Sequence, residues 1–176
     1  FYPLQLRFTL HLKQSAEKYT HQQIQPALFS DIPSWMDLMR LVIDGYPVMN
    51  ETEYLENLKE SILEKRALIL KDGPVLIGAL AFSRSQGSID FLGIHPQYRN
   101  CGIQKLFLNA LLLIHLPGQD ISTTTYRKGD KADTGYRNML LKLGFSEREL
   151  LTEYGYPTQR FVYQNRHGEE KDHASP

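Results

Sequence analysis

The sequence is poor in cysteine and has no excess of charge of either sign. Cys101 is the single cysteine among 176 residues, so an intramolecular disulfide and a cysteine-rich zinc site are both excluded. Lys and Arg number 20 and Asp and Glu number 20, which gives a formal net charge of zero. Proteins that bind nucleic acid or anionic membranes usually carry a basic balance or a basic stripe. We therefore expect neither kind of partner.

Long apolar runs and metal-ligand patterns are also missing. The longest apolar stretch, residues 106–116, is interrupted by Asn109 and His115 and has about half the length of a membrane span. The six histidines are scattered, and no pair has the spacing of metal ligands. No secretory signal pattern opens the chain, which begins with Phe1. These features predict a soluble, cytoplasmic protein without a metal site.

Hydrophobic periodicity predicts a mixed α/β chain. Residues 2–12 alternate apolar and polar side chains as an amphipathic strand does, and we assign residues 1–22 to an N-terminal extension. Residues 23–165 carry the domain, and residues 166–176 form a polar tail that we expect to be disordered. The domain pattern predicts strands at 24–29, 67–71, 75–82, 88–94, 121–126, 145–151 and 160–163, and helices at about 31–45, 51–65, 102–115 and 133–143.

One stretch has the features of a ligand-binding site. It is the turn between the strand at 88–94 and the helix that opens at Gly102. The first N–H groups of a helix have no internal acceptor, and the helix dipole adds partial positive charge beside them. Such a helix start favours an anion, usually a phosphate. Gly102 removes a Cβ from the line of approach, and Arg99 can add a charge-assisted hydrogen bond. An ordinary strand-to-helix turn is the alternative interpretation.

The same stretch resembles the acyl-CoA-binding segment of the GNAT N-acetyltransferase superfamily. Four residues match the family's strand, proline and Arg-x-x-Gly turn ahead of a helix: Ile94, Pro96, Arg99 and Gly102. A later Leu-Gly-Phe that ends at Phe145 matches a second family feature. The order of predicted elements fits the family from about residue 23 to 163. The resemblance implies a GNAT fold of the α/β (α+β) class, with a mixed central sheet of about six to seven strands, splayed in the middle, helices on both faces and an extra N-terminal strand.

By this resemblance, the donor is acetyl-CoA or another acyl-CoA. The strand backbone would pair with the pantetheine arm, and an N–H near Leu92 or Gly93 would polarise the thioester carbonyl. Backbone N–H groups of the turn would hold the pyrophosphate. Gln104 stands where the family has a second small residue, and we expect binding in spite of it. The expected acyl-CoA-binding residues are Leu92, Gly93, Ile94, Arg99, Asn100, Cys101, Gly102, Ile103, Gln104 and Asp133.

The implied catalysis needs a base for the amine and an acid for the departing thiolate. Asp90 is the expected base, because Ser88, the other candidate on its strand face, is a poor one. A merely solvated aspartate near a strand end is the alternative. Many family members place a tyrosine acid at the position of Leu140, which cannot donate. Tyr136 or Tyr126 would then substitute, or CoA would leave as a thiolate.

The predicted reaction moves an acetyl group from acetyl-CoA to a primary amine of a small molecule. The family walls its acceptor site with the first two helices, so Tyr46, Met49 and Tyr54 are the expected lining residues. A catalytically weak acyl-CoA-binding sensor or regulatory module is the alternative, since Leu140 and Gln104 depart from the pattern. The N-terminal strand would pack on its own domain or, alternatively, pair with a second copy in a homodimer.

Overall fold

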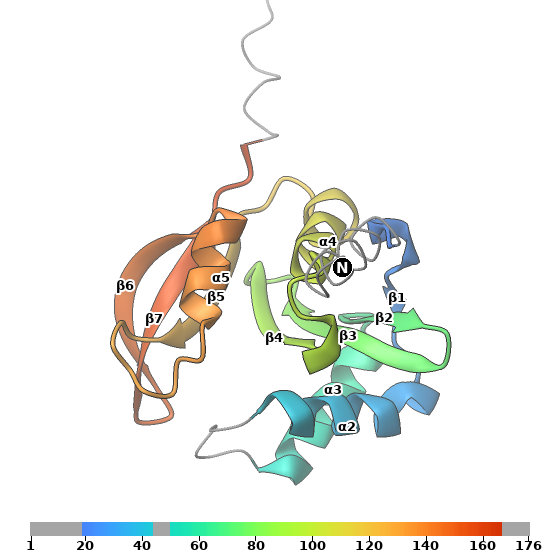
Figure 1. Ribbon diagram of the computed structural model, residues 1–176. Helices are drawn as coiled ribbons and strands as arrows, with labels where there is room; N and C mark the ends of the chain where they lie inside the picture. The colour runs from blue at the N-terminus through green and yellow to red at the C-terminus, as the bar shows by residue number, and fades with distance from the viewer. Residues whose placement is uncertain (1–18, 44–49, 167–176) are drawn as a thin grey trace, which may run out of the picture. The chain divides into compact units, whose positions relative to one another are not determined.

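The computed structural model of the chain describes residues 19–43 and 50–166 (Figure 1). The α-helices of these residues are α2 (Ile32–Val42), α3 (Glu51–Leu63), α4 (Ile103–Ala110) and α5 (Tyr136–Leu143). The strands are β1 (Gln25–Pro26), β2 (Ala67–Asp72), β3 (Val75–Ser83), β4 (Ser88–Ile94), β5 (Ile121–Tyr126), β6 (Ser146–Glu153) and β7 (Tyr156–Tyr163). The predicted strand at 2–12, the side chains of Tyr46 and Met49, and the tail from residue 167 lie outside the described residues.

These seven strands follow the order β1-β2-β3-β4-β5-β7-β6, which confirms the predicted mixed sheet. The β1–β2, β2–β3, β5–β7 and β6–β7 pairs are antiparallel, and β4–β5 is parallel. In the described residues, the β4–β5 register is set by Ser88 opposite Ser122, at the start of β4. The β5–β7 register, by contrast, runs along all of β5.

The described residues divide into two compact units, one within Phe1–Phe82 and Phe91–Leu111 and the other within Ser83–Asp90 and Leu112–Pro176. In the first unit, α2 and α3 cover one face of the β2–β3 hairpin (Figure 1). Trp35 on α2 and Leu58 on α3 pack with Ile69 of β2, and all three side chains are buried. Burial of one such side chain contributes about 1.5–3 kcal/mol. This core holds β2 and β3 in place, and β4 lies next to β3 in the same sheet.

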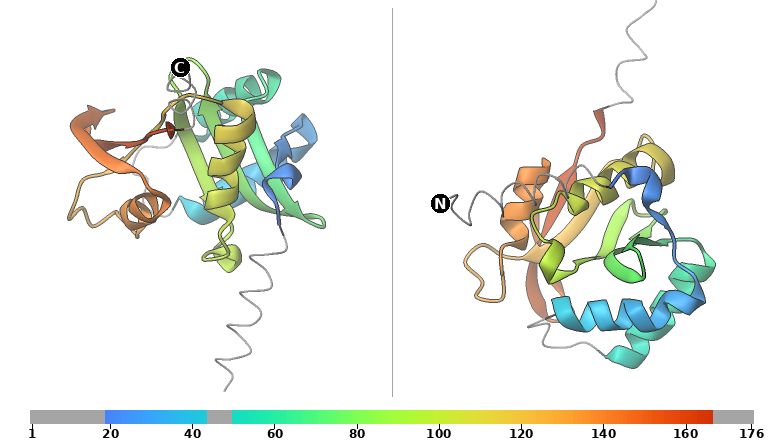
Figure 2. Two further views of the ribbon diagram at one scale, coloured as in Figure 1. Left: turned by 90° about the horizontal axis from the view of Figure 1, so that it is seen from above. Right: turned by 45° about the vertical axis from the view of Figure 1, so that its right-hand side comes forward.

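Helix α4 lies on the opposite face of the same strands (Figure 2). Its side chains Ile103 and Phe107 are fully buried and lie against Gly78 of β3. Successive residues of a strand point to opposite faces, so Gly78 faces α4 while Ala79 faces the core formed by α2 and α3. The expected helices on both faces of the sheet are thus present in this unit.

The second unit is built from β5, β6 and β7 with α5 against them. Arg137 of α5 is buried, and its guanidinium donates to the carbonyl of Tyr126 and to Oε1 of Gln159, each at 2.8 Å. It also pairs with the carboxylate of Glu147 and lies 5.0 Å from the ring centroid of Phe161. A buried cation with this many partners is stable and ties the helix to all three strands.

Two local predictions were wrong. The strand expected at 24–29 is only β1, followed by a 3-10 turn (Phe29–Asp31), because Oδ2 of Asp31 accepts the Leu28 N–H at 2.8 Å. The helix expected to residue 115 ends at Ala110 and continues as a π-helical segment, Leu111–His115. The wider π turn breaks the apolar stripe of α4. Leu113 and Ile114 of this segment are 58% and 53% exposed.

Two properties of the described residues bear on function classes. Every helix in residues 19–43 and 50–166 is too short or too polar to cross a membrane. The same residues contain no group of three or more His, Cys, Asp or Glu side chains that could hold a metal ion.

Candidate functional site

The turn that follows β4 begins with a short capped helix. The His95 N–H donates to the carbonyl of Ile77 at 2.8 Å, which ties the end of β4 to β3. A 3-10 turn, η3 (Pro96–Tyr98), starts next, with Pro96 in the first position where a missing N–H does no harm. Nδ1 of His95 accepts the Gln97 N–H at 3.2 Å and caps this turn. The chain is therefore fixed in direction just before Arg99.

Two residues of the following turn have left-handed backbones. Asn100 has φ +63° and Gly102 has φ +73°. Glycine adopts this region without strain, and asparagine is among the few other residues that visit it routinely. A Cβ on Gly102 would meet no atom within 4 Å. The backbone conformation, rather than crowding by the protein, therefore requires glycine here, and the space beside Gly102 is open.

The start of α4 presents N–H groups that no carbonyl of the helix accepts. The first helical bond runs from the Leu106 N–H to the Gly102 carbonyl at 3.3 Å, so the N–H groups of Ile103, Gln104 and Lys105 have no intrahelical acceptor. The first turn of α4 holds no acidic residue. Arg99 and Lys105 are both exposed. Donors, dipole and nearby cations all favour an anion at this position.

Two side chains, one from the turn and one from the start of α4, are buried. Cys101 is 4% exposed, with its Sγ 3.7 Å from the Arg99 carbonyl oxygen, and Ile103 is fully buried. Gly93 and Ile94 of β4 are buried, and Leu92 is half-buried. The structure therefore brings the predicted acyl-CoA residues from Leu92 to Gln104 together in one unit, as a strand end, a turn and a helix start.

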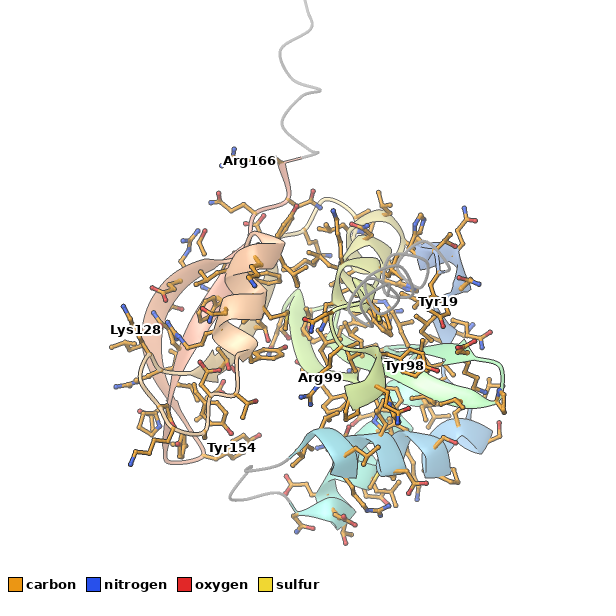
Figure 3. All side chains as sticks on the ribbon, viewed as in Figure 1. Tyr19, Tyr98, Arg99, Lys128, Tyr154 and Arg166 are labelled. Atoms are coloured by element: carbon orange, nitrogen blue, oxygen red, sulfur yellow. The ribbon has the colours of Figure 1, made fainter. Side chains whose placement is uncertain are left out.

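Sequence reasoning missed the group of side chains that holds this turn. The Tyr98 hydroxyl donates to Oδ2 of Asp72 at 3.3 Å, from η3 to the β2–β3 hairpin. Tyr19, which is 6% exposed, also hydrogen-bonds to the Asp72 carboxylate. Burial and this carboxylate raise the pKa of Tyr19 far above its ordinary value. Figure 3 labels Tyr19, Tyr98 and Arg99. Asp72 lies 26 residues before Tyr98 in the chain, so no local pattern reveals the contact.

An aromatic group from α2, α3 and β4 lies in the first unit. Nε1 of Trp35 donates to the Tyr54 hydroxyl oxygen at 2.7 Å. The Phe91 ring is 5.8 Å from the Tyr54 ring and 5.9 Å from Trp35, between centroids. Burial raises the pKa of Tyr54 in spite of the Trp35 N–H, which acts in the opposite direction. Tyr54 is thus the one predicted acceptor-lining residue that the structure describes.

The second unit holds the predicted base. Asp90 is exposed on β4, and its Oδ1 accepts the Ser88 hydroxyl at 2.9 Å. The expected common face of these two residues is therefore confirmed. The structure leaves the catalytic role of Asp90 as a prediction.

Asp133 acts as the cap of α5. Its Oδ1 accepts the N–H groups of Gly135, Tyr136 and Arg137 at 3.1, 3.0 and 3.4 Å. Three orphan donors at a helix start are thereby satisfied by one carboxylate oxygen. The contact of Asp133 with acyl-CoA stays a prediction.

Both candidate acids lie close to Asp133. The Tyr136 N–H is bound by it, and Tyr126 is half-buried with a pKa raised by burial and by the carboxylates of Asp130 and Asp133. The Tyr126 ring stacks edge-on against that of Tyr156, 5.6 Å away. The Tyr126 hydroxyl is therefore protonated at neutral pH, and its raised pKa makes it a weaker acid than an ordinary tyrosine.

Comparisons with known proteins identify the fold. No protein-family model and no curated protein matches the sequence. A GNAT-family acetyltransferase from Bacillus cereus has a similar structure, with a TM-score of 0.62 and 20% identity over 80% of this chain and 95% of that one. The ribosomal-protein-S18-alanine N-acetyltransferase from Escherichia coli gives a TM-score of 0.60 and 12% identity, over 79% and 90%.

A third solved structure is a GNAT-like decarboxylase in complex with isobutyryl-CoA. Its TM-score is 0.59 at 12% identity, and the match covers 82% of this chain and 100% of that one. The chain therefore has the GNAT fold, which confirms the fold implied by the turn from Arg99 to Gly102.

Proposed function

We propose that the protein is an N-acetyltransferase that moves an acetyl group from acetyl-CoA to a primary amine of a small molecule. The observation that carries this proposal is the Arg99–Gly102 turn. Its left-handed Gly102 opens α4 with N–H donors that have no intrahelical acceptor, beside exposed cations and with no acid in the first turn. These features fit a pyrophosphate, because backbone N–H groups at a helix start bind phosphate oxygens without side chains.

The proposed transfer is a direct attack. The amine loses a proton to Asp90 and its nitrogen forms a C–N bond with the acetyl carbon. The C–S bond breaks, and the CoA sulfur leaves with the bonding electrons. It takes a proton from Tyr126 or Tyr136, or stays a thiolate, since thiols ionise near neutral pH. A backbone N–H near Leu92 or Gly93 would stabilise the oxyanion in the transition state.

Acceptor chemistry is suggested by the aromatic group of the first unit. Trp35 donates its indole N–H to the Tyr54 oxygen, so the Tyr54 hydroxyl keeps its own proton for another acceptor. Phe91 presents a ring beside it. Aromatic faces attract ammonium groups, and a chain with zero net charge has no general preference for a polyanion. This combination supports a small amine as acceptor.

A catalytically weak acyl-CoA-binding module is the second candidate. Leu140 is fully buried and aliphatic, so the position at which many GNAT enzymes carry an acid supplies none. The two candidates differ in turnover and share the donor site. Release of CoA thiol from acetyl-CoA, measured against a panel of amines, separates them. Amine-dependent release supports the enzyme, and tight binding without release supports the module.

A further inference from the structure

The turn that carries the proposed donor site is held by hydrogen bonds to a residue far from it in the sequence. The Tyr98 hydroxyl, one residue before Arg99, donates to Asp72 at 3.3 Å. The Tyr19 hydroxyl reaches the same carboxylate. A carboxylate only accepts hydrogen bonds, so both tyrosines act as donors. Asp72 thus joins the β2–β3 hairpin, the turn after β4 and the segment ahead of η1 (His21–Gln23).

Tyr19 is the buried member of this anchor, and Asp72 and Tyr98 are half-buried. Tyr19 is 6% exposed and Cys101 is 4% exposed, and the Cys101 thiol is near enough to affect the pKa of Tyr19. The 3-10 helix η1, which starts two residues after Tyr19, packs against α4 (Figure 2). Tyr19 is therefore linked to the turn through Asp72 and Tyr98, and η1 packs against the helix whose N–H groups are the proposed donors.

Orientation decides how well such donors work. Backbone N–H groups bind an anion strongly only when the turn already holds them in place, and neighbouring packing and hydrogen bonds supply that order. The turn itself contains two left-handed residues, Asn100 and Gly102, and is open on its outer side. The contacts that hold the turn in place must therefore come from its inner side, through the side chains of Tyr98 and Cys101.

We infer that Tyr19, Asp72 and Tyr98 are positioning residues for the acyl-CoA turn, and that residue 19, ahead of the common GNAT pattern, helps to set donor affinity. The inference rests on the proposed donor site. None of the three is a catalytic residue, because each acts through the turn. Loss of one hydroxyl should weaken donor binding and leave the chemical step unchanged.

Single hydroxyl deletions test this in the full chain. Tyr19→Phe and Tyr98→Phe each keep the ring and remove one donor. Asp72→Ala removes the acceptor, and Asp72→Asn restores an acceptor oxygen. Tyr154→Phe is the matched control, because Tyr154 is 96% exposed. Calorimetric titration with CoA gives Kd, and transfer assays give KM and kcat.

We expect Tyr19→Phe and Tyr98→Phe each to raise the Kd for CoA roughly tenfold, the size expected when a hydrogen bond to a charged group is lost. KM for acetyl-CoA should rise in parallel, kcat at saturation should hold, and Asp72→Asn should bind CoA more tightly than Asp72→Ala. An unchanged Kd in both phenylalanine variants, or a fall in kcat alone, overturns the inference. Wild-type protein that fails to bind CoA overturns the proposed function instead.

The single cysteine supplies a second readout that does not need activity. The Cys101 side chain is buried on the inner side of the turn, so the rate of its alkylation reports how often the turn opens locally. Tyr19→Phe should speed alkylation severalfold at a temperature where the global unfolding transition of the variant has not begun. Alkylation at the wild-type rate contradicts the positioning role.

Discussion

The ring of Phe107 on α4 lies directly against Gly78 on β3. A Cβ at Gly78 would be 2.6 Å from Cε2 of Phe107 and 3.3 Å from Cγ2 of Ile103. Carbon atoms pack at about 3.5–4.0 Å, so no side chain fits between the strand and the helix. Glycine therefore lets α4 approach the sheet closely, and this sets the position of the first turn of α4, where the proposed phosphate donors begin.

Gly78→Ala should lower the free energy of unfolding by about 1–3 kcal/mol, because overpacking forces side chains or backbone to shift. Chemical denaturation measures the change. Phe107→Leu in the Gly78→Ala background should recover part of the loss, since the two positions are in contact. Strictly additive effects of the two substitutions would show that the ring is not what excludes the methyl group.

Gly102 should tolerate only residues that accept a left-handed backbone. With φ +73° and open space around it, Gly102→Ala should cost about 1–2 kcal/mol through backbone strain alone. Gly102→Asn should cost less, because asparagine visits this region more readily. Unfolding free energies of the two variants provide the comparison. Equal losses for Ala and Asn would mean that the left-handed conformation is not the constraint.

Removal of the Tyr54 hydroxyl should leave the buried indole N–H of Trp35 without its acceptor. We expect Tyr54→Phe to lower the free energy of unfolding by about 1–3 kcal/mol. Trp35 is the only tryptophan in the sequence, so intrinsic fluorescence reports this contact directly. The emission spectrum of folded Tyr54→Phe should differ from that of the wild type. Identical spectra together with unchanged stability would contradict the hydrogen bond.

Some elements could be predicted from the sequence because their signal is local. The strands β4 and β5 begin and end where their apolar and threonine-rich patterns do, at Ser88–Ile94 and Ile121–Tyr126. The Arg99–Gly102 turn could be predicted because the need for a glycine with a left-handed backbone before a helix appears in the sequence as a short Arg-x-x-Gly motif. Helix α4 was predicted too long because a π turn and an α turn have the same apolar composition, and only their hydrogen bonds differ.

The contacts that hold the site depend on the tertiary structure. Asp72 ends a strand of the β2–β3 hairpin, and nothing near it in the sequence indicates a contact with Tyr98 or Tyr19. Trp35 is buried, and its indole N–H donates to Tyr54, which lies 19 residues later in the chain on the next helix. Such pairs come from chain packing, so periodicity can indicate that a residue is buried and cannot identify its partner.

Stability should fall in acid through Asp31. This carboxylate is buried, lies 2.7 Å from Nζ of Lys71 and accepts the Leu28 N–H. Burial alone would raise its pKa, but the Lys71 ammonium and the N–H outweigh burial, so the folded pKa is lower than the ordinary value. The stabilisation is thus complete above the unfolded pKa of about 3.9 and is lost as the pH falls through the folded pKa.

Denaturation curves at neutral pH and in acid measure this dependence. Asp31→Asn should be less stable than the wild type at neutral pH, and the difference should shrink as the pH falls below about 4. Asp37→Asn, on the exposed side of α2, is the control and should track the wild type. A gap between Asp31→Asn and the wild type that does not change with pH would refute the linkage.

Asp90 should matter for turnover and not for donor binding. We expect Asp90→Asn to lower kcat roughly 10²-fold or more, the usual size of a general-base effect, with the Kd for CoA unchanged. Ser88→Ala removes the hydroxyl that donates to Asp90 and should keep most of the activity, because the carboxylate remains. Steady-state kinetics on both variants decide the matter. Full turnover in Asp90→Asn removes this residue from the mechanism.

The most direct test of the donor site is calorimetric titration of the full chain with acetyl-CoA, with CoA and free pantetheine in parallel. The account predicts micromolar binding of acetyl-CoA and CoA, and much weaker binding of pantetheine, because the turn from Arg99 to Gly102 recognises the pyrophosphate. Absence of binding at millimolar acetyl-CoA would contradict it, and would mean that the GNAT fold is present here without its donor site.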